Sequence, residues 1–347
     1  MGQKTIYLDR NENNYGPAPA CFEVLRRADI SRMSWYTRAH KEGIKSILSA
    51  RIARDFKLPE DRVLLGYGAE NILKQAIQCY LGENEKLMVP AYSWWYYKLI
   101  ASEVNGLSVE YPLVAGSDQF SYDLAGMREV FRREHPKIVF ISSPNNPTGN
   151  SLPLEDLQDI LDEFAGTMVV LDEAYTYHGR IDYVTGLVER HPNLLVVRTF
   201  SKYYALAGIR IGFALMGSNL GNLAKFTNRY LGYHRLSEEI AIAALDSPQY
   251  YSSIARKMKE DKEEYYAALG KIPGFTVYRS DANFILVAIP SQHKEPLQKF
   301  LTEKGLIVKF MSEELLNSHI RITLGTQEEN SMLLDAIKEY FELMRSP

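Results

Sequence analysis

Four groups of polar residues come directly after short apolar runs, at the points where the chain would leave a β-strand. They are Gly66-Tyr67-Gly68-Ala69-Glu70, Ser143-Pro144-Asn145-Asn146-Pro147-Thr148-Gly149, Asp172-Glu173-Ala174-Tyr175 and Ser201-Lys202. Each group alone has a plain explanation, as a turn, a helix cap or a surface lysine. Ligands of open α/β sheets, however, bind at the carboxyl ends of the strands. The four groups together therefore predict one ligand site that contains an amine, a carboxylate, amides and hydroxyls.

The signatures of several other kinds of site do not occur in the sequence. The seven histidines are scattered, and there is no HExxH motif or Cys/His cluster with the spacing of a metal site. We also find no GxGxxG after a strand, no GxxxxGK[ST] loop and no GxSxG elbow. Metal ligation, the common nucleotide sites and serine hydrolysis are therefore not predicted.

Apolar runs alternate with amphipathic stretches between about residues 60 and 216, and they predict the elements that position these groups. The strand candidates are Arg62–Leu65, Lys86–Val89, Lys137–Ser142, Met168–Asp172, Leu194–Phe200 and Ile211–Met216. Several are rich in Val, Ile and Leu without polar alternation, which is typical of strands buried on both faces. With helix candidates between them, such as Glu70–Leu81 and Leu154–Ala165, the pattern predicts a mostly parallel sheet covered by helices on both sides.

The pattern changes after about residue 217. A charged helical segment, Gln249–Lys271, is followed by strand-like runs at Phe275–Arg279 and Asn283–Ile289, and then by helix candidates near Glu295–Lys304 and Glu328–Met344. This part predicts a smaller α+β domain. We divide the chain into an N-terminal arm (1–30), a large domain (31–245) and a small domain (246–347).

Taken together, the motifs resemble the fold-type I pyridoxal-phosphate-dependent aminotransferases. The resemblance rests on the groups at Asn146, Asp172 and Lys202, on Leu206-Ala207-Gly208-Ile209-Arg210, and on Arg321-Ile322-Thr323-Leu324-Gly325-Thr326. The opening Arg10-Asn11-Glu12-Asn13 is similar to the histidinol-phosphate aminotransferase branch. The resemblance implies an α/β fold with a mostly parallel seven-stranded sheet in the large domain, and pyridoxal 5′-phosphate as the cofactor.

The resemblance also implies a role for each residue around the cofactor ring. Lys202 would bond to the aldehyde and later move the Cα proton of the substrate. Asp172 would keep the pyridine nitrogen protonated, because a nearby negative charge favours the cationic form. Asn146 and Tyr175 would bind the 3-oxygen of the ring, and Tyr92 would stack on its face.

The cofactor phosphate needs hydrogen-bond donors and positive charge. The backbone N–H groups of Ala69 and Glu70 at a predicted helix start suit an anion, and Ser201 and Arg210 would add a hydroxyl and a guanidinium. Tyr36 matches a tyrosine that the family sends to the phosphate of the partner subunit. The resemblance therefore implies a homodimer with shared active sites.

For the substrates, Arg321 would grip a carboxylate through two parallel hydrogen bonds. Asn146, Lys309 and Tyr15 complete the expected substrate-binding set. The implied reaction is a ping-pong transfer of an amino group from histidinol phosphate or a related or aromatic amino acid to 2-oxoglutarate, within amino-acid biosynthesis.

Two features depart from the histidinol-phosphate branch, and an unusually aromatic run has no assigned role. The chain lacks the longer N-terminal lead, and Lys309 stands where the family places an arginine for the distal phosphate. The run Trp94-Trp95-Tyr96-Tyr97 could line a pocket for a bulky side chain, or could pack in the domain or dimer interface. The alternative reaction is decarboxylation as in threonine-phosphate decarboxylases, which tend to carry Pro where this chain has Ala207.

Composition limits the partners. The 347 residues carry 40 basic and 43 acidic side chains, a formal net charge of −3, so no basic surplus indicates nucleic acid or anionic lipid. No apolar run approaches the roughly 18 residues of a membrane span. The two cysteines, Cys21 and Cys79, form neither a CxxC pair nor a disulfide framework. We expect a cytoplasmic protein.

Overall fold

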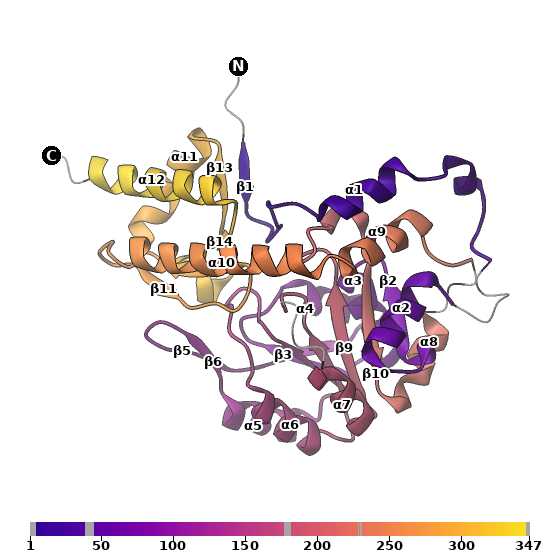
Figure 1. Ribbon diagram of the computed structural model, residues 1–347. Helices are drawn as coiled ribbons and strands as arrows, with labels where there is room; N and C mark the ends of the chain where they lie inside the picture. The colour runs from indigo at the N-terminus through magenta and orange to yellow at the C-terminus, as the bar shows by residue number, and fades with distance from the viewer. Residues whose placement is uncertain (1–4, 39–44, 177–181, 228, 230, 345–347) are drawn as a thin grey trace.

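The computed structural model describes residues 5–38, 45–176, 182–227, 229 and 231–344. Figure 1 shows two regions built around separate sheets, with the long helix α10 (Pro248–Leu269) running from one region to the other. The larger region holds a seven-stranded sheet and the smaller one a five-stranded sheet. Both sheets are mixed in direction, and each carries part of the predicted site.

The seven-stranded sheet has the order β2-β10-β9-β8-β7-β3-β4. Its strands are β2 (Val63–Gly66), β3 (Lys86–Pro90), β4 (Leu107–Tyr111), β7 (Ile138–Ser142), β8 (Met168–Asp172), β9 (Leu194–Thr199) and β10 (Gly212–Met216). Pairing is parallel from β9 through β8, β7 and β3 to β4, whereas β10 is antiparallel to both of its neighbours. The predicted mostly parallel α/β sheet is confirmed. The predicted strand ranges overlap the observed ones, but β4 was not predicted because it lies at the sheet edge and is largely exposed.

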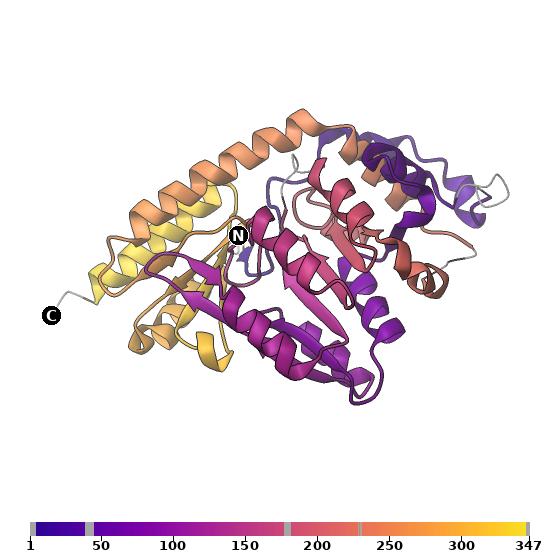
Figure 2. The same ribbon diagram turned by 90° about the horizontal axis from the view of Figure 1, so that it is seen from below.

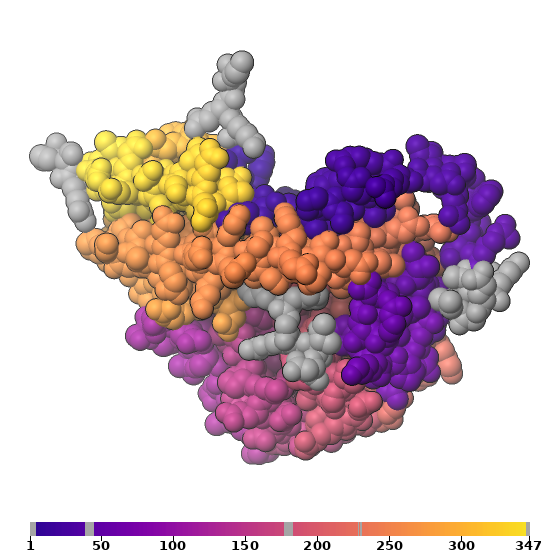
Figure 3. Space-filling model, in the orientation of Figure 1, coloured from indigo at the N-terminus to yellow at the C-terminus, as the bar shows by residue number. Residues whose placement is uncertain are grey.

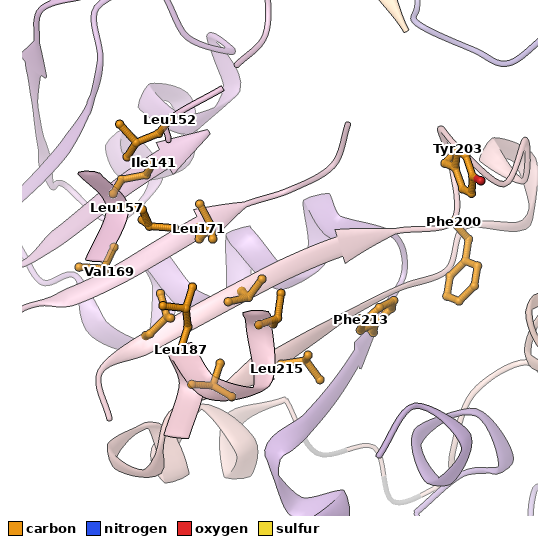
Figure 4. Packing of buried hydrophobic residues seen from close by; sticks show 14 of the residues in the cluster. Ile141, Leu152, Leu157, Val169, Leu171, Leu187, Phe200, Tyr203, Phe213 and Leu215 are labelled. Carbon is orange, nitrogen blue, oxygen red and sulfur yellow. The ribbon is translucent and has the colours of Figure 1, made fainter. Parts of the chain in front are cut away.

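Helices cover both faces of this sheet, as the uniformly apolar strands require. One face packs against α2 (Ile47–Phe56), α5 (Leu124–Glu134), α6 (Leu154–Glu163), α7 (Asp182–Arg190) and α9 (Arg235–Leu245). The other face packs against α3 (Ala69–Tyr80), α4 (Tyr96–Glu103) and α8 (Gly221–Phe226). Successive residues of β8 alternate between the two cores, and Figure 4 shows Val169 and Leu171 on the first face with Leu157 of α6 and Leu187 of α7.

The five-stranded sheet has the order β1-β13-β14-β12-β11 and draws on both ends of the chain. Its strands are β1 (Ile6–Leu8), β11 (Thr276–Tyr278), β12 (Phe284–Ala288), β13 (Leu306–Phe310) and β14 (His319–Thr323). Helices α10, α11 (Lys294–Glu303) and α12 (Gln327–Leu343) bury its apolar face. Because β1 pairs in parallel with β13, the N-terminal segment starts on the small sheet. Figure 2 shows α10 and α12 side by side along this region.

From β1 the chain crosses toward the large region and enters α1 (Pro19–Arg26), which packs against α9. The space-filling view shows this N-terminal stretch lying along α10 on the upper side of the molecule (Figure 3). A hairpin of β5 (Leu113–Ala115) and β6 (Phe120–Tyr122) reaches the small region, where the N–H of Arg279 donates to the carbonyl of Asp118 at 2.7 Å. The N-terminal stretch and this hairpin thus both connect the large region to the small one.

Within the described residues, none of the helices has the length and apolar character needed to cross a membrane.

Candidate active site

The predicted polar groups meet at one edge of the seven-stranded sheet. Strands β2, β7, β8 and β9 run in the same direction, and their carboxyl ends lead into Gly68, Asn146, Tyr175 and Lys202 respectively. Arg210 reaches the same edge for the opposite reason, because it stands just before the antiparallel strand β10 begins. The topology therefore brings the family's motifs together as the sequence predicted.

Lys202 follows β9 in a short turn, where its side chain enters the space between the two sheets. The amine donates a hydrogen bond to the carbonyl of Arg10 at 2.8 Å and lies 5.7 Å from the centre of the Tyr175 ring. Burial, together with the positive charge of Arg321, lowers the pKa of this amine to about 8, while the charge of Glu12 acts in the opposite direction. A neutral amine, which is the form that attacks carbonyl groups and accepts protons, is thereby accessible near neutral pH.

Asp172 is the last residue of β8 and is buried, with 4% of its surface exposed. One carboxylate oxygen accepts a 3.0 Å hydrogen bond from the backbone N–H of Ala174, and the other accepts a 2.5 Å hydrogen bond from the hydroxyl of Tyr97. Burial raises the pKa of this carboxyl, while the two donors lower it. The site therefore holds a carboxylate that a buried cation could neutralise.

Arg321 connects the small sheet to the residues of the large one. It lies on β14, and its guanidinium donates to Oδ1 of Asn146 at 2.6 Å and to the carbonyl of Asp9 at 2.6 Å. The buried Nε has no hydrogen-bond partner among the described residues. Burial lowers the pKa of Arg321, while the charges of Asp9 and Glu313 act in the opposite direction. In the described part of the chain no carboxylate forms a salt bridge with Arg321, so its guanidinium could receive an anionic group.

The N-terminal segment Asp9–Asn13 covers these residues, a contribution that the sequence motif alone did not reveal. Its carbonyls accept from Lys202 and Arg321, as described above, and the side-chain amide of Asn11 donates to the hydroxyl of Tyr175 at 3.0 Å. Asn13 is fixed in turn by a 3.0 Å hydrogen bond to the carbonyl of Tyr203. An amine and a guanidinium thus converge on two consecutive residues of one segment.

An anion cradle lies where β2 turns into α3. Gly68, with φ +78°, precedes the helix, and in the described part of the chain no side chain caps its first turn. A Cβ at Gly68 would lie 2.8 Å from an Arg210 guanidinium nitrogen, so glycine leaves room for that side chain. Free N–H groups at a helix start beside a guanidinium form an anion site. The buried Ser201 follows β9, and Glu70 lies 3.4 Å from Arg210, so its carboxylate binds that guanidinium.

The remaining predicted residues have varied surroundings. Tyr92 is partly buried, with its ring 5.4 Å from that of Phe120 in an edge-on arrangement. Tyr15 points to α10, where its hydroxyl donates to Asp261 at 2.9 Å, so it is already bonded within the protein. Lys309 stands directly opposite Arg321 in the β13–β14 pair and is exposed. Tyr36 is 70% exposed. The roles of these residues toward ligands stay predictions.

The aromatic run after Tyr92 does not form a pocket wall as a unit. Trp94 and Tyr96 are partly buried and pack against the core that α3 and α4 form with the sheet. Trp95 is exposed, and Tyr97 is fully buried in contact with Asp172. The contact of Tyr97 with Asp172 is a site feature that sequence reasoning missed. Its only signal was an unusual density of aromatic residues.

No cluster of three or more His, Cys, Asp or Glu side chains suited to a metal ion occurs in the described ranges.

Comparisons with known proteins show what the whole chain is similar to. The family model described as "Aminotransferase class I and II" matches residues 3–337. The histidinol-phosphate aminotransferase of Ruminiclostridium cellulolyticum is 31% identical over 96% of this chain and 91% of that protein. The crystal structure of the histidinol-phosphate aminotransferase of Sinorhizobium meliloti, in complex with pyridoxal-5′-phosphate, aligns with a TM-score of 0.86 at 23% identity, over 98% of this chain and 92% of that chain.

The fold alone does not select one reaction. The L-threonine-O-3-phosphate decarboxylase of Porphyromonas gingivalis aligns with a TM-score of 0.81 at 19% identity, over 97% of this chain and 99% of that chain. At this level of identity the likeness shows a shared fold, so the chemistry must be argued from the site.

Proposed function

Since this chain belongs to the aminotransferase class I and II family, whose members depend on pyridoxal phosphate, we propose that it transfers the amino group of histidinol phosphate or a related amino compound to 2-oxoglutarate in two half-reactions. The observation that carries the proposal is the convergence of Lys202 and Arg321 on the carbonyls of Arg10 and Asp9. A substrate that replaces these carbonyls would meet an amine and a guanidinium at once.

The residues present fit pyridoxal phosphate. The uncapped start of α3, with Gly68 and Arg210, suits its phosphate, and Asp172 at the opposite end of the site suits a ring nitrogen. We assign Asn146 and Tyr175 to the 3-oxygen of the ring. When bound, the cofactor supplies an aldehyde that captures amines and an electron-withdrawing ring that stabilises negative charge on the adjacent carbon.

The chain's own residues would then move the protons. Lys202, with its pKa lowered to about 8, would take a proton from the substrate carbon and return it. Asp172 holds its negative charge in a buried position, where it favours a protonated ring nitrogen. Arg321 fixes an anionic group of the substrate and so orients the carbon toward the amine of Lys202. The N-terminal segment Asp9–Asn13 lies over the amine and the guanidinium.

The position of Lys309 supports the proposal that the substrate carries a phosphate. Its strand register places it directly opposite Arg321, and opposite residues of paired strands project on the same face, about 5 Å apart. A substrate with a distal phosphate could bind both cations. Lysine would bind the phosphate as a point charge, without the planar geometry of the arginine that the family uses.

A half-reaction screen tests the substrate. The protein loaded with pyridoxal phosphate would be mixed separately with histidinol phosphate, histidinol, glutamate, aromatic amino acids and threonine phosphate, and the loss of the visible band would be followed. We expect rapid conversion to the pyridoxamine form with histidinol phosphate. Lys309→Ala should lower kcat/KM for histidinol phosphate by about tenfold but leave histidinol unaffected, and Lys309→Arg should retain the preference.

Two other results of the screen would change the proposed substrate or the proposed reaction. Conversion by glutamate or aromatic amino acids only would keep the aminotransferase and reject the phosphate-bearing substrate. Release of carbon dioxide from threonine phosphate would contradict transamination as the main reaction.

We also propose a homodimer in which Tyr36 completes the partner's phosphate site. The support is a row of exposed apolar side chains between α1 and residue 36, at positions where a monomer would normally carry polar groups. They are Phe22, Leu25, Ile30, Met33, Trp35 and Tyr36. An isologous interface over this row would place the same residues of both subunits at the shared sites.

Subunit complementation tests the shared site. Tyr36→Ala and Lys202→Ala are each expected to lower activity strongly. If each site takes Tyr36 from one subunit and Lys202 from the other, mixed and refolded subunits should regain about one quarter of the wild-type activity, because half of the dimers are mixed and each has one intact site. No recovery, with mixed dimers demonstrated by sedimentation, would contradict the shared site.

A cytoplasmic location also stays a proposal. It is supported by the two free cysteines, Cys21 and Cys79, which form no disulfide with each other.

A further inference from the structure

We propose that Tyr97 is a positioning residue for the cofactor: its hydroxyl orients Asp172 and keeps it ionised, so that the proton of the pair resides on the ring nitrogen. The inference rests on the proposed function, because it assumes that Asp172 faces that nitrogen. It concerns a residue of the aromatic run Trp94-Trp95-Tyr96-Tyr97, for which the site described above has no other use.

The hydrogen bond between Tyr97 and Asp172 is short and fully enclosed. The donor and acceptor oxygens are 2.5 Å apart, Tyr97 is 1% exposed and Asp172 is 4% exposed. Hydrogen bonds from hydroxyls to carboxylates of this length are charge-assisted and among the strong ones. Because both residues are buried, the phenol takes the place that water would have beside an exposed carboxylate.

The ring of Tyr97 is packed between aromatic neighbours that direct its hydroxyl toward Asp172. It stands in the first turn of α4 and packs edge-on against Phe140 of β7, with ring centres 4.9 Å apart. Trp94 packs against its other side at 5.7 Å, also edge-on. Trp94 of the aromatic run and Phe140 of β7 therefore pack against the ring, and the ring carries the hydroxyl to the end of β8.

The phenol of Tyr97 carries its proton and can donate it in a hydrogen bond at neutral pH. Burial and the adjacent charge of Asp172 raise the pKa of Tyr97 well above its ordinary value, so the hydroxyl keeps its proton. The other groups around Asp172 are Glu173, Tyr122, Tyr175 and the N–H of Ala174. Burial is the largest effect that disfavours the ionised form of Asp172, and the charge of Glu173 adds to it. Tyr97 and Ala174 supply the two hydrogen bonds that oppose them.

The hydrogen bond from Tyr97 determines whether one proton resides on the ring nitrogen or on the carboxylate of Asp172. A carboxylate beside a pyridine nitrogen shares a proton with it, and the partner that is more basic holds it. The phenol stabilises the anionic carboxylate and so makes it the weaker base, which leaves the proton on nitrogen. Without the phenol, a buried oxygen of Asp172 loses its partner, the carboxylate becomes more basic, and the proton moves toward it.

Nitrogen-15 NMR of the holoenzyme measures this proton directly. The enzyme would be loaded with pyridoxal phosphate labelled at the ring nitrogen, whose chemical shift differs between the protonated and unprotonated ring. We expect the protonated value in the wild type at neutral pH. In Tyr97→Phe the resonance should move toward the unprotonated value, with the ratio of protonated to unprotonated ring lower by roughly tenfold or more.

Two further variants separate this role from a loss of packing. Tyr111→Phe removes another fully buried hydroxyl, which donates to the carbonyl of Phe140 at 3.0 Å, and should leave the resonance at the wild-type value. In an Asp172→Asn background, which lacks the carboxylate, Tyr97→Phe should produce no additional shift. If Tyr97→Phe does not fold, 3-fluorotyrosine at position 97 keeps the shape. Its more acidic phenol is the stronger donor to Asp172, so at a pH where the ring nitrogen is only partly protonated the resonance should move toward the protonated value, and an unchanged or opposite shift would overturn the role of Tyr97.

The outcomes are distinguishable. A Tyr97→Phe resonance equal to that of the wild type would overturn the role of Tyr97. An equal shift in Tyr111→Phe would do the same, because the effect would then come from packing. If instead the wild type holds no labelled cofactor, the proposed function itself fails.

Discussion

Replacement of Lys202 by alanine should abolish turnover while the fold persists. The amine is the only group at the end of β9 that can bond to an aldehyde, and it is also the base next to the substrate carbon. Losing both functions should lower kcat by at least about 10⁴-fold, the upper range for a single acid–base group. The visible absorbance band of the enzyme-bound cofactor should disappear with it, because that band requires the bond to Lys202.

The measurement combines an absorbance spectrum, turnover and circular dichroism on the same preparation. Lys202→Arg is the matched control for charge, since it keeps a cation beside Tyr175 but cannot form the bond; it should be as inactive as Lys202→Ala. An unaltered visible spectrum in Lys202→Ala would show that another residue holds the cofactor. A lost circular dichroism signal would show that the lysine is required for folding instead.

Replacement of Arg321 by alanine should weaken amino- and oxo-acid use far more than cofactor binding. The guanidinium makes two 2.6 Å hydrogen bonds, to Asn146 and to the carbonyl of Asp9, and has a buried Nε without a partner in the described chain. A bidentate contact with a carboxylate contributes about 3 kcal/mol, so kcat/KM should fall by about 10²-fold. Steady-state kinetics with both substrates measures the loss, and equilibrium dialysis measures the cofactor.

Two other variants define what the loss means. Arg321→Lys keeps the charge without the fork and should give an intermediate kcat/KM. Arg279→Ala removes an exposed arginine that lies outside the site, paired with Asp118 and Glu263 at 3.5 Å, and should leave the kinetics unchanged. Cofactor loss in Arg321→Ala, with substrate affinity retained, would assign the arginine to the cofactor.

Much of the site could be predicted because the ligand-binding groups of an open α/β sheet lie at the carboxyl ends of its strands. The apolar runs that end at Ser142, Asp172 and Thr199 each show where a buried strand stops, and the next residues must lie at the sheet edge. The strands themselves were predictable to within a residue or two because they are apolar on both faces. The same logic failed for β4, whose exposed residues carry no such signal.

The sequence by itself determined which chemistry is available and which strand ends carry it: Lys202, Asp172, Asn146 and Arg321 follow from motifs that are local in the chain. Only the tertiary structure decided which groups touch. The antiparallel direction of β10 brings Arg210 to the site, the β13–β14 register sets Lys309 opposite Arg321, and the helix packing of α4 directs Tyr97 to Asp172. Tyr97 and Asp172 are 75 positions apart in the chain. The segment Asp9–Asn13 meets Tyr175 and Lys202 from the middle of the chain and Arg321 from near its C-terminus. Such pairings depend on register, strand direction and side-chain packing, which are properties of the assembled core and leave no spacing pattern in the chain.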